Sequence, residues 1–183
     1  FLWEKAMETP IHDFLKEYAQ SGTARLHMPG GKGLAYPHDI TEIDGADVLY
    51  SSSGIIRASE DNASALFGAG ATCYSCGGAT LAIQAMLAAA CEATGKHTIA
   101  AGRCSHRSLI SSAVLLGLNV NWIYPDEFPC GTVAPADVES AVDSDTAAVF
   151  VTSVDYLGEQ CDMAAIAGVC RRRGVLLLAD NAH

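Results

Sequence analysis

AAVFVT at residues 147–152 and GVLLLA at residues 174–179 are two short, almost continuously apolar stretches. Strands become apolar along their whole length when helices cover both faces of the sheet, which is how parallel sheets are built. The two stretches therefore predict an α/β protein with a mainly parallel sheet flanked by helices. In such a sheet a ligand lies outside the carboxyl ends of the strands, so residues at those ends are candidates for function.

The chain around these stretches alternates between helix-like and strand-like segments from residue 59 onward. Helices are expected at residues 59–67, 79–93, 106–116, 135–142 and 162–172. Strands are expected at residues 71–75, 97–101, 120–124, 147–152 and 175–179.

The N-terminal part of the chain has a different character. Residues 9–18 predict a short amphipathic helix, with Thr9 as the N-cap and Pro10 at the first helical position, where a missing N–H costs nothing. The glycine- and proline-rich stretch that follows predicts an extended arm or loop. We therefore divide the chain into an N-terminal helix and arm, residues 1–58, and the N-terminal part of a ligand-binding domain, residues 59–183.

The charge of the chain limits the class of partner. The formal net charge is −10, without a long run of either sign. Binding to nucleic acid needs a basic surface that displaces counterions from phosphates, so we expect no nucleic-acid partner. A cationic small molecule is a more natural ligand for an acidic protein.

Seven cysteines are scattered along the chain. They do not form the regular framework of a small secreted domain, which indicates a reducing, cytoplasmic compartment. Cys73 and Cys76 form a CxxC motif, but no second CxxC or histidine pair follows at zinc spacing, so we expect buried structural thiols and no metal site. The longest apolar stretch, residues 81–91, is too short to cross a membrane, and we expect no membrane partner.

The segment SCGGAT, residues 75–80, precedes a long expected helix. Glycine allows the backbone to approach a ligand closely, and a helix N-terminus offers N–H groups and a positive dipole to an anion. A phosphate group fits there. A tight turn without a ligand explains the composition equally well, because the spacing matches neither GxGxxG nor the Walker pattern.

Asp180 and His106 also follow expected strands. A carboxylate at the end of a buried strand is poorly solvated and needs a specific partner, such as a positively charged ligand atom. A helix N-cap is the alternative interpretation of Asp180. The flat imidazole of His106 can stack on a ring or move protons, and the alternative is an ordinary capping or surface residue.

A phosphate cradle, a planar stacking group and a carboxylate at one edge of a sheet together fit a phosphorylated pyridine. Pyridoxal phosphate withdraws electrons effectively only when its ring nitrogen is protonated, and a buried carboxylate beside that nitrogen raises the pKa of the nitrogen. Pyridoxal 5′-phosphate is therefore the expected cofactor.

Several motifs resemble the bacterial ornithine/lysine/arginine decarboxylases, which are pyridoxal-phosphate enzymes with the aspartate-aminotransferase fold, called fold type I. TPIHDFLKEY at residues 9–18 and HMPGGKG at residues 27–33 are similar to the family's N-terminal helix and its MPGHKG motif, with Gly31 in place of histidine. The block from Asp39 to Ala69 is similar to the family's DITE…DDL…GxI…A…FGA signature, and it is the most specific part of the resemblance.

The resemblance implies roles for particular residues. Gly78, Ala79 and Thr80 match the segment that binds the cofactor phosphate, which in the family reads Asn-Gly-Thr-Ser from the position of Gly77. The hydroxyl lost at Ala79 removes one hydrogen bond to the phosphate, worth about 1 kcal/mol.

Two further positions match the family's catalytic residues. His106 matches the histidine that stacks on the pyridine ring, and Asp180 matches the aspartate that pairs with the ring nitrogen. His183 ends a DNAH segment similar to the family's Asp-Glu-Ala-His, and is expected to bind the cofactor as well. The resemblance thus implies the N-terminal part of a fold-type-I large domain.

The chain departs from the family at several positions besides Gly31, Gly77 and Ala79. Val154 and Asp155 stand where the family has proline and threonine in Ser-Pro-Thr-Tyr-x-Gly, and Asn181 replaces glutamate. Together these departures leave open a change of substrate or of activity.

The function that the resemblance implies is decarboxylation of lysine, arginine or ornithine to the corresponding amine, in a cytoplasmic homodimer. In the family, the lysine that holds the cofactor covalently lies downstream of the Asp-Glu-Ala-His segment, so we expect this chain to be an inactive fragment of a longer enzyme. One alternative is another pyridoxal-phosphate reaction on the same fold, such as that of an aminotransferase or a carbon–sulfur lyase. The other is a non-catalytic fragment or interaction module.

Overall fold

The computed structural model describes residues 7–32, 36, 38–125 and 131–182. The chain divides into two compact units, residues 1–76 and residues 77–183. Contacts therefore group residues 59–76 with the N-terminal segment, whereas the sequence suggested a division after residue 58. The division into an N-terminal arm and a ligand-binding domain stays a prediction.

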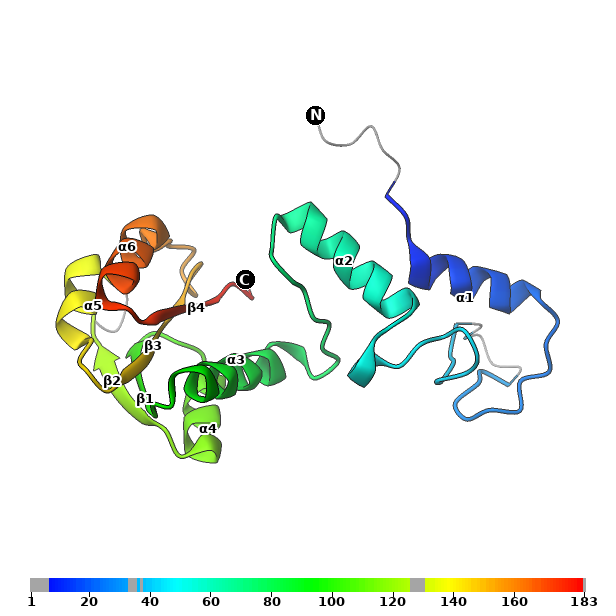
Figure 1. Ribbon diagram of the computed structural model, residues 1–183, viewed down its shortest axis with the longest axis horizontal. Coiled ribbons are helices and arrows are strands. Elements are labelled where there is room, and N and C mark those ends of the chain that lie inside the picture. The colour runs from blue at the N-terminus through cyan, green and yellow to red at the C-terminus, as the bar shows by residue number, and fades with distance from the viewer. Residues whose placement is uncertain (1–6, 33–35, 37, 126–130, 183) are drawn as a thin grey trace. The chain divides into compact units, whose positions relative to one another are not determined.

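The second unit contains a four-stranded sheet (Figure 1), with the strand order β2-β1-β3-β4. All three strand pairs are parallel. The strands are β1 (Thr98–Gly102), β2 (Asn119–Ile123), β3 (Thr146–Thr152) and β4 (Leu176–Asp180). The two stretches that predicted the fold thus form neighbouring strands, and the expected parallel α/β architecture is confirmed.

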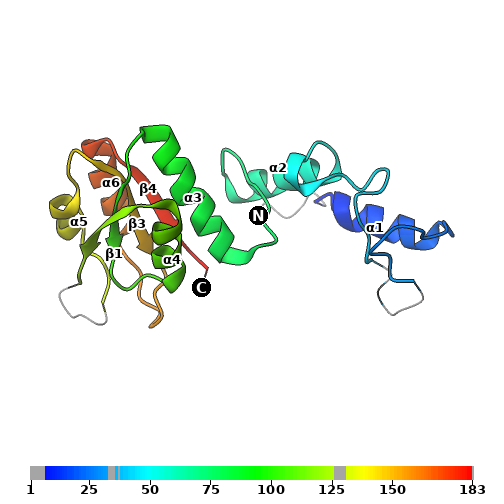
Figure 2. The ribbon, with the colours of Figure 1, turned by 90° about the horizontal axis from the view of Figure 1, so that it is seen from below.

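Helices cover both faces of the sheet (Figure 2), with α3 (Gly78–Thr94) and α4 (Arg107–Leu116) on one face and α5 (Pro135–Ala141) and α6 (Met163–Arg173) on the other. Three of them, α3, α4 and α6, end at a glycine with a positive φ, the backbone conformation that closes a helix at no steric cost to glycine.

From Ala148 onward, the side chains of β3 alternate between two hydrophobic cores. Val149 and Val151 pack in the core that holds the buried residues of α5 and α6. Ala148 and Phe150 pack in the core that holds those of α3 and α4. This alternation follows from the two-residue period of a strand, and it fixes the face on which every later residue of β3 lies.

The first unit contains α1 (Pro10–Gln20), a short 3-10 helix (Leu49–Ser51) and α2 (Ile55–Phe67). Pro10 is at the start of α1, as the sequence predicted, but Thr9 makes no capping bond to the backbone and its hydroxyl donates to Asp13 instead. Between α1 and the 3-10 helix the described residues form no helix or strand, in agreement with the predicted arm.

The strand predicted at residues 71–75 is wrong. These residues form no helix or strand, and polar groups among them bond to α2 instead of to a neighbouring strand. The backbone N–H of Tyr74 donates to the carboxylate of Glu60 at 2.8 Å, and the hydroxyl of Ser64 donates to that of Thr72 at 3.0 Å.

The prediction of buried thiols at the CxxC motif is also wrong. Cys73 and Cys76 are exposed, whereas Cys91 and Cys170 are buried in the second unit. Both CxxC residues lie in the segment between α2 and α3, which forms no strand and joins neither core. Within the part of the chain that the structure describes, no helix combines the length and apolar character needed to span a membrane.

Candidate functional site

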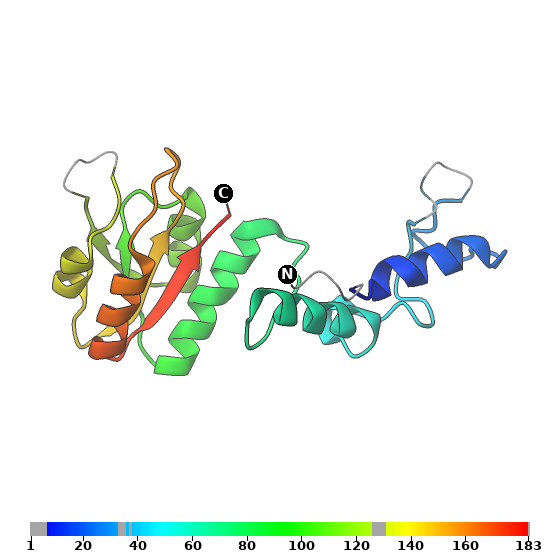
Figure 3. The same ribbon diagram turned by 90° about the horizontal axis from the view of Figure 1, so that it is seen from above.

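The candidate site lies at the carboxyl edge of the parallel sheet, where β1, β3 and β4 end. Helix α3 packs against β3 and β4. Figure 3 shows that α3 runs antiparallel to β4, so the first turn of the helix lies at the same edge as the end of that strand. The topology therefore brings the predicted phosphate-binding segment and the predicted ring-binding residues to one edge.

Asp180 is the last residue of β4 and is buried, with 6% of its surface exposed. Its Oδ1 accepts a hydrogen bond from the backbone N–H of Ala182 at 3.2 Å. Among the described residues no other group donates to this carboxylate. Because buried carboxylates need partners, Asp180 is suited to bind a cationic or protonated ligand atom.

Thr152 ends β3 and is the register partner of Asp180. Its Oγ1 is buried and has no hydrogen-bond partner among the residues that the structure describes. Thr152 was not among the residues predicted from the sequence. A signal was present, because Thr152 is a polar residue that closes an apolar strand, as Asp180 does.

His106 is the N-cap of α4, four residues beyond the end of β1. Its Nδ1 accepts a hydrogen bond from the backbone N–H of Ser108 at 3.2 Å and lies 2.8 Å from the hydroxyl oxygen of Ser108. Since a backbone N–H can only donate, Nδ1 is the acceptor and the neutral ring carries its proton on Nε2. The capping role that the sequence left open is thus confirmed, while stacking on a ligand stays a prediction.

Gly78, Ala79 and Thr80 form the exposed first turn of α3. No side chain caps this turn, so its N–H groups face outward at the positive end of the helix dipole. The turn begins with a sharp bend, because Gly78 has φ +65°. These features suit an anion such as phosphate.

The strand order separates the two ring-binding candidates. β3 lies between β1, which precedes His106, and β4, which carries Asp180. Because neighbouring strands are about 4.7–4.9 Å apart, the ends of β1 and β4 are separated by about 10 Å. A planar ring fits between them, over the end of β3. His183, the remaining predicted cofactor residue, lies outside the described residues.

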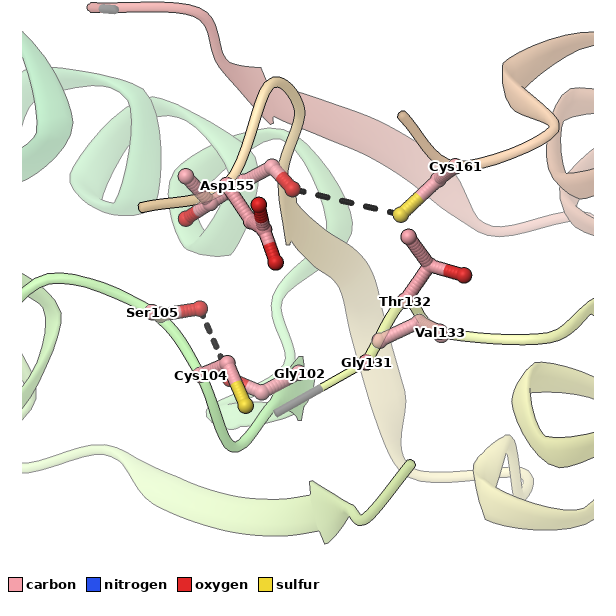
Figure 4. Close-up of a pocket in the computed structure, with 9 residues that line it drawn as sticks. Gly102, Cys104, Ser105, Gly131, Thr132, Val133, Asp155 and Cys161 are labelled. Atoms are coloured by element: carbon pink, nitrogen blue, oxygen red, sulfur yellow. Dashed lines mark hydrogen bonds between the residues drawn. The ribbon is translucent and has the colours of Figure 1, made fainter. Parts of the chain in front are cut away.

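A small pocket at the same edge is lined by the loops after β1 and β3 and by residues 131–133 (Figure 4). Its volume is about 260 Å³, including the open mouth. The Asp155 side chain is directed into this pocket in Figure 4, and its Oδ1 accepts hydrogen bonds from the backbone N–H groups of Leu157 and Glu159 at 2.8 Å each. Asp155 therefore holds the loop after β3 in shape, at a position where the resembling family has threonine.

Acidic residues of the block from Asp39 to Ala69 have structural roles in the first unit. Asp47 accepts hydrogen bonds from the backbone N–H groups of Gly54 and Ile56 at the start of α2, at 2.8 and 3.0 Å. Partial desolvation raises the pKa of Asp47, but backbone hydrogen bonds outweigh it and lower the pKa to about 2. Glu60 is buried and accepts from Ser52 and Tyr74, and the bond from Tyr74 is the main reason that its pKa is lowered.

The family assignment rests on comparison with known sequences. The profile of the DegT/DnrJ/EryC1/StrS aminotransferase family matches residues 39–183. The chain belongs to this family. The match covers α2, the whole sheet and every candidate residue at its carboxyl edge.

Two curated relatives indicate different reactions within this broad group. The arginine decarboxylase of Bacillus subtilis (strain 168) is 29% identical over 196 residues, which cover 96% of this chain and 40% of that protein. Cysteine desulfurase IscS of Ectopseudomonas mendocina is 37% identical over 93 residues, which cover 49% of this chain and 22% of that protein. The chain spans about 40% of the length of the curated relatives that align with nearly all of it.

A solved structure supports the fold. The structure titled NIFS-like protein superposes with a TM-score of 0.58 over 90% of this chain and 48% of its own, at 16% identity. At that identity the likeness concerns the fold alone. The second unit is thus part of a fold-type-I large domain, and the cofactor of this enzyme class is pyridoxal phosphate.

The residues at the carboxyl edge fit pyridoxal phosphate. The uncapped first turn of α3 would hold the phosphate, the buried carboxylate of Asp180 would pair with the protonated ring nitrogen, and the ring of His106 would lie against the pyridine. The buried hydroxyl of Thr152 is a further polar group at this edge, and it has no hydrogen-bond partner in the described part of the chain.

Proposed function

We propose that the protein containing this chain is a pyridoxal-phosphate-dependent decarboxylase of a basic amino acid, namely arginine, lysine or ornithine. The observation that carries the proposal is the extent of the match to a relative named arginine decarboxylase. That match covers 96% of the chain, including the first unit, whereas the family profile begins at residue 39. The likeness to a decarboxylase therefore extends beyond the part that is common to the wider family.

The residues of the chain suit this chemistry. Pyridoxal phosphate, when bound, supplies an electron sink for bonds broken at Cα of an amino acid. Asp180 would hold a proton on the ring nitrogen, because a buried carboxylate stabilises an adjacent positive charge. His106 would fix the plane of the ring, and the start of α3 would anchor the phosphate.

The net charge of −10 is consistent with a cationic substrate, because an acidic protein attracts cations to its surface. Asp155 adds a carboxylate beside the site in the pocket of Figure 4. We further propose a homodimer, which sedimentation analysis of the whole protein would test.

The experiment is an amine-product assay on the whole protein with pyridoxal phosphate and arginine, lysine or ornithine in separate reactions. The proposal expects agmatine from arginine, or a diamine from lysine or ornithine. In the variant Asp180→Asn turnover should fall by about 100-fold or more, because removing one partner of a buried ion pair costs about 3–5 kcal/mol.

The matched control is Asp162→Asn. Asp162 is the exposed N-cap of α6, and its Oδ1 accepts from the N–H of Ala165 at 2.9 Å. Asparagine caps helices as well as aspartate does, so this variant should keep the activity of the unmodified protein. A whole protein that binds the cofactor but forms no amine from any of the three substrates would refute the proposal.

The second candidate function is a carbon–sulfur lyase reaction, which the 37% identity to a cysteine desulfurase over 93 residues favours. This second function would be supported if cysteine gave sulfide or a persulfide while the basic amino acids gave no amine.

A further inference from the structure

The Oγ1 atom of Thr152 is the one buried side-chain nitrogen or oxygen, within the described part of the chain, that lacks a hydrogen-bond partner. A buried hydroxyl without a partner destabilises a folded protein, and valine would fill nearly the same volume without that penalty. The hydroxyl is therefore expected to find its partner outside the residues that the structure describes.

The position of Thr152 in β3 indicates the side on which that partner lies. Ala148 and Phe150 pack in the core of α3 and α4, so Thr152, two residues further, lies on the same face of the sheet. Its register partner Asp180 lies on this face too, two residues beyond Leu178 of the same core. The face is the one that α3 covers, with its uncapped first turn at this edge.

Thr152 is also central among the cofactor residues. β3 lies between the strand that precedes His106 and the strand that ends in Asp180. A ring held between these two residues therefore covers the end of β3. The hydroxyl of Thr152 lies one strand away from the carboxylate that would bind the ring nitrogen.

The chemistry of the cofactor selects the partner atom. Of the polar substituents of the pyridoxal ring, the phenolic oxygen is the nearest to the ring nitrogen, and it is an acceptor. A hydroxyl beside the residue that binds the nitrogen is suited to donate to it.

We propose that Thr152 is a cofactor-binding residue whose hydroxyl donates a hydrogen bond to the phenolic oxygen of pyridoxal phosphate. The inference rests on the cofactor of the family and not on the decarboxylase reaction, and its test needs no turnover.

The experiment measures binding of pyridoxal phosphate and of 3-deoxypyridoxal phosphate, which lacks the phenolic oxygen, to the whole protein after removal of its cofactor. In Thr152→Val the affinity for pyridoxal phosphate should fall by about threefold to tenfold, the effect of one lost hydrogen bond. The affinity for the 3-deoxy analogue should change less than about twofold. Thr152→Ser, which keeps the hydroxyl, should restore most of the difference between the two ligands.

Thermal unfolding of the cofactor-free protein separates this role from a structural one. Thr152→Val should melt at the same or a higher temperature than the unmodified protein, because a methyl group replaces an unsatisfied hydroxyl. Thr146→Val is the matched control on the same strand. The hydroxyl of Thr146 donates to Asp143 Oδ1 at 2.8 Å and accepts from the N–H of Asp143 at 3.0 Å, so this variant should melt at a lower temperature.

Three results would overturn the proposal. One is unchanged affinity for pyridoxal phosphate in Thr152→Val. Another is an equal loss of affinity for both ligands, which would place the hydroxyl elsewhere than at the phenolic oxygen. The third is a lower melting temperature of the cofactor-free variant, which would mean that the hydroxyl has its partner within the protein.

Discussion

His106 has two separable roles, and two substitutions should divide them. His106→Asn keeps a side-chain acceptor for the N–H of Ser108 but removes the flat ring. His106→Phe keeps a flat ring but cannot accept the hydrogen bond that caps α4. We expect the asparagine variant to lose cofactor affinity at nearly full stability, and the phenylalanine variant to lose stability with most of its cofactor affinity kept.

The magnitudes follow from the geometry. Loss of an N-cap costs about 0.5–2 kcal/mol, so His106→Phe should unfold at a temperature lower by a few degrees, since about 1 kcal/mol corresponds to about 2–4 °C in a domain of 150–250 residues. An aromatic contact contributes about 0.5–1.5 kcal/mol beyond the area that it buries, so His106→Asn should bind pyridoxal phosphate about twofold to twelvefold more weakly.

The assays are thermal unfolding of the cofactor-free whole protein and titration with pyridoxal phosphate followed by fluorescence. Unchanged cofactor affinity in His106→Asn would show that the ring does not contact the cofactor. An unfolding temperature for His106→Phe equal to that of the unmodified protein would show that the hydrogen bond to Ser108 does not stabilise α4. Either result would refute the corresponding half of the reasoning.

Two further predictions concern the cores and the acidic block. Leu87→Ala, at a fully buried position of α3, should lower the free energy of unfolding by about 2–5 kcal/mol. Leu115→Ala, at an exposed position of α4, should change it by less than about 0.5 kcal/mol. Urea denaturation measures both values. Because the pKa of Asp47 is lowered from 3.8 to about 2, its carboxylate should stabilise the first unit at pH values above 3.8. This stabilisation should disappear as the pH falls towards about 2. An NMR titration of the Asp47 carboxyl carbon with a midpoint near 3.8 would contradict that prediction.

The sequence predicted the sheet well because its signal is local. AAVFVT and GVLLLA are apolar on both faces. The first forms β3, which is buried between the two cores, and the second forms the edge strand β4, whose Leu177 and Leu178 pack partly against opposite cores. The segment ATCYS at residues 71–75 was expected to form a strand as well, but it forms none. The N–H of Tyr74 donates to Glu60 of α2. No local sequence pattern indicates that a carboxylate 14 positions away takes the place of a neighbouring strand.

The candidate site was predicted only in part, for a related reason. Asp180 stands out because it directly follows an apolar run, and His106 stands out because it lies shortly after a predicted strand and at the start of a predicted helix. Thr152 is less visible, since threonine is a common residue of strands. What distinguishes it is the lack of a partner for its hydroxyl and its register with Asp180, and both properties depend on the pairing of β3 with β4.

The pairing of β4 with β3 also has a consequence for the order of folding. The start of α3 is the first part of the site to be synthesised, and Asp180 follows only after the helices and strands between them. The site therefore depends on contacts between residues far apart in the sequence, which form late and slowly. A ligand that binds only the assembled edge stabilises the native state alone, so the cofactor should act on the finished sheet and leave its nucleation unaffected.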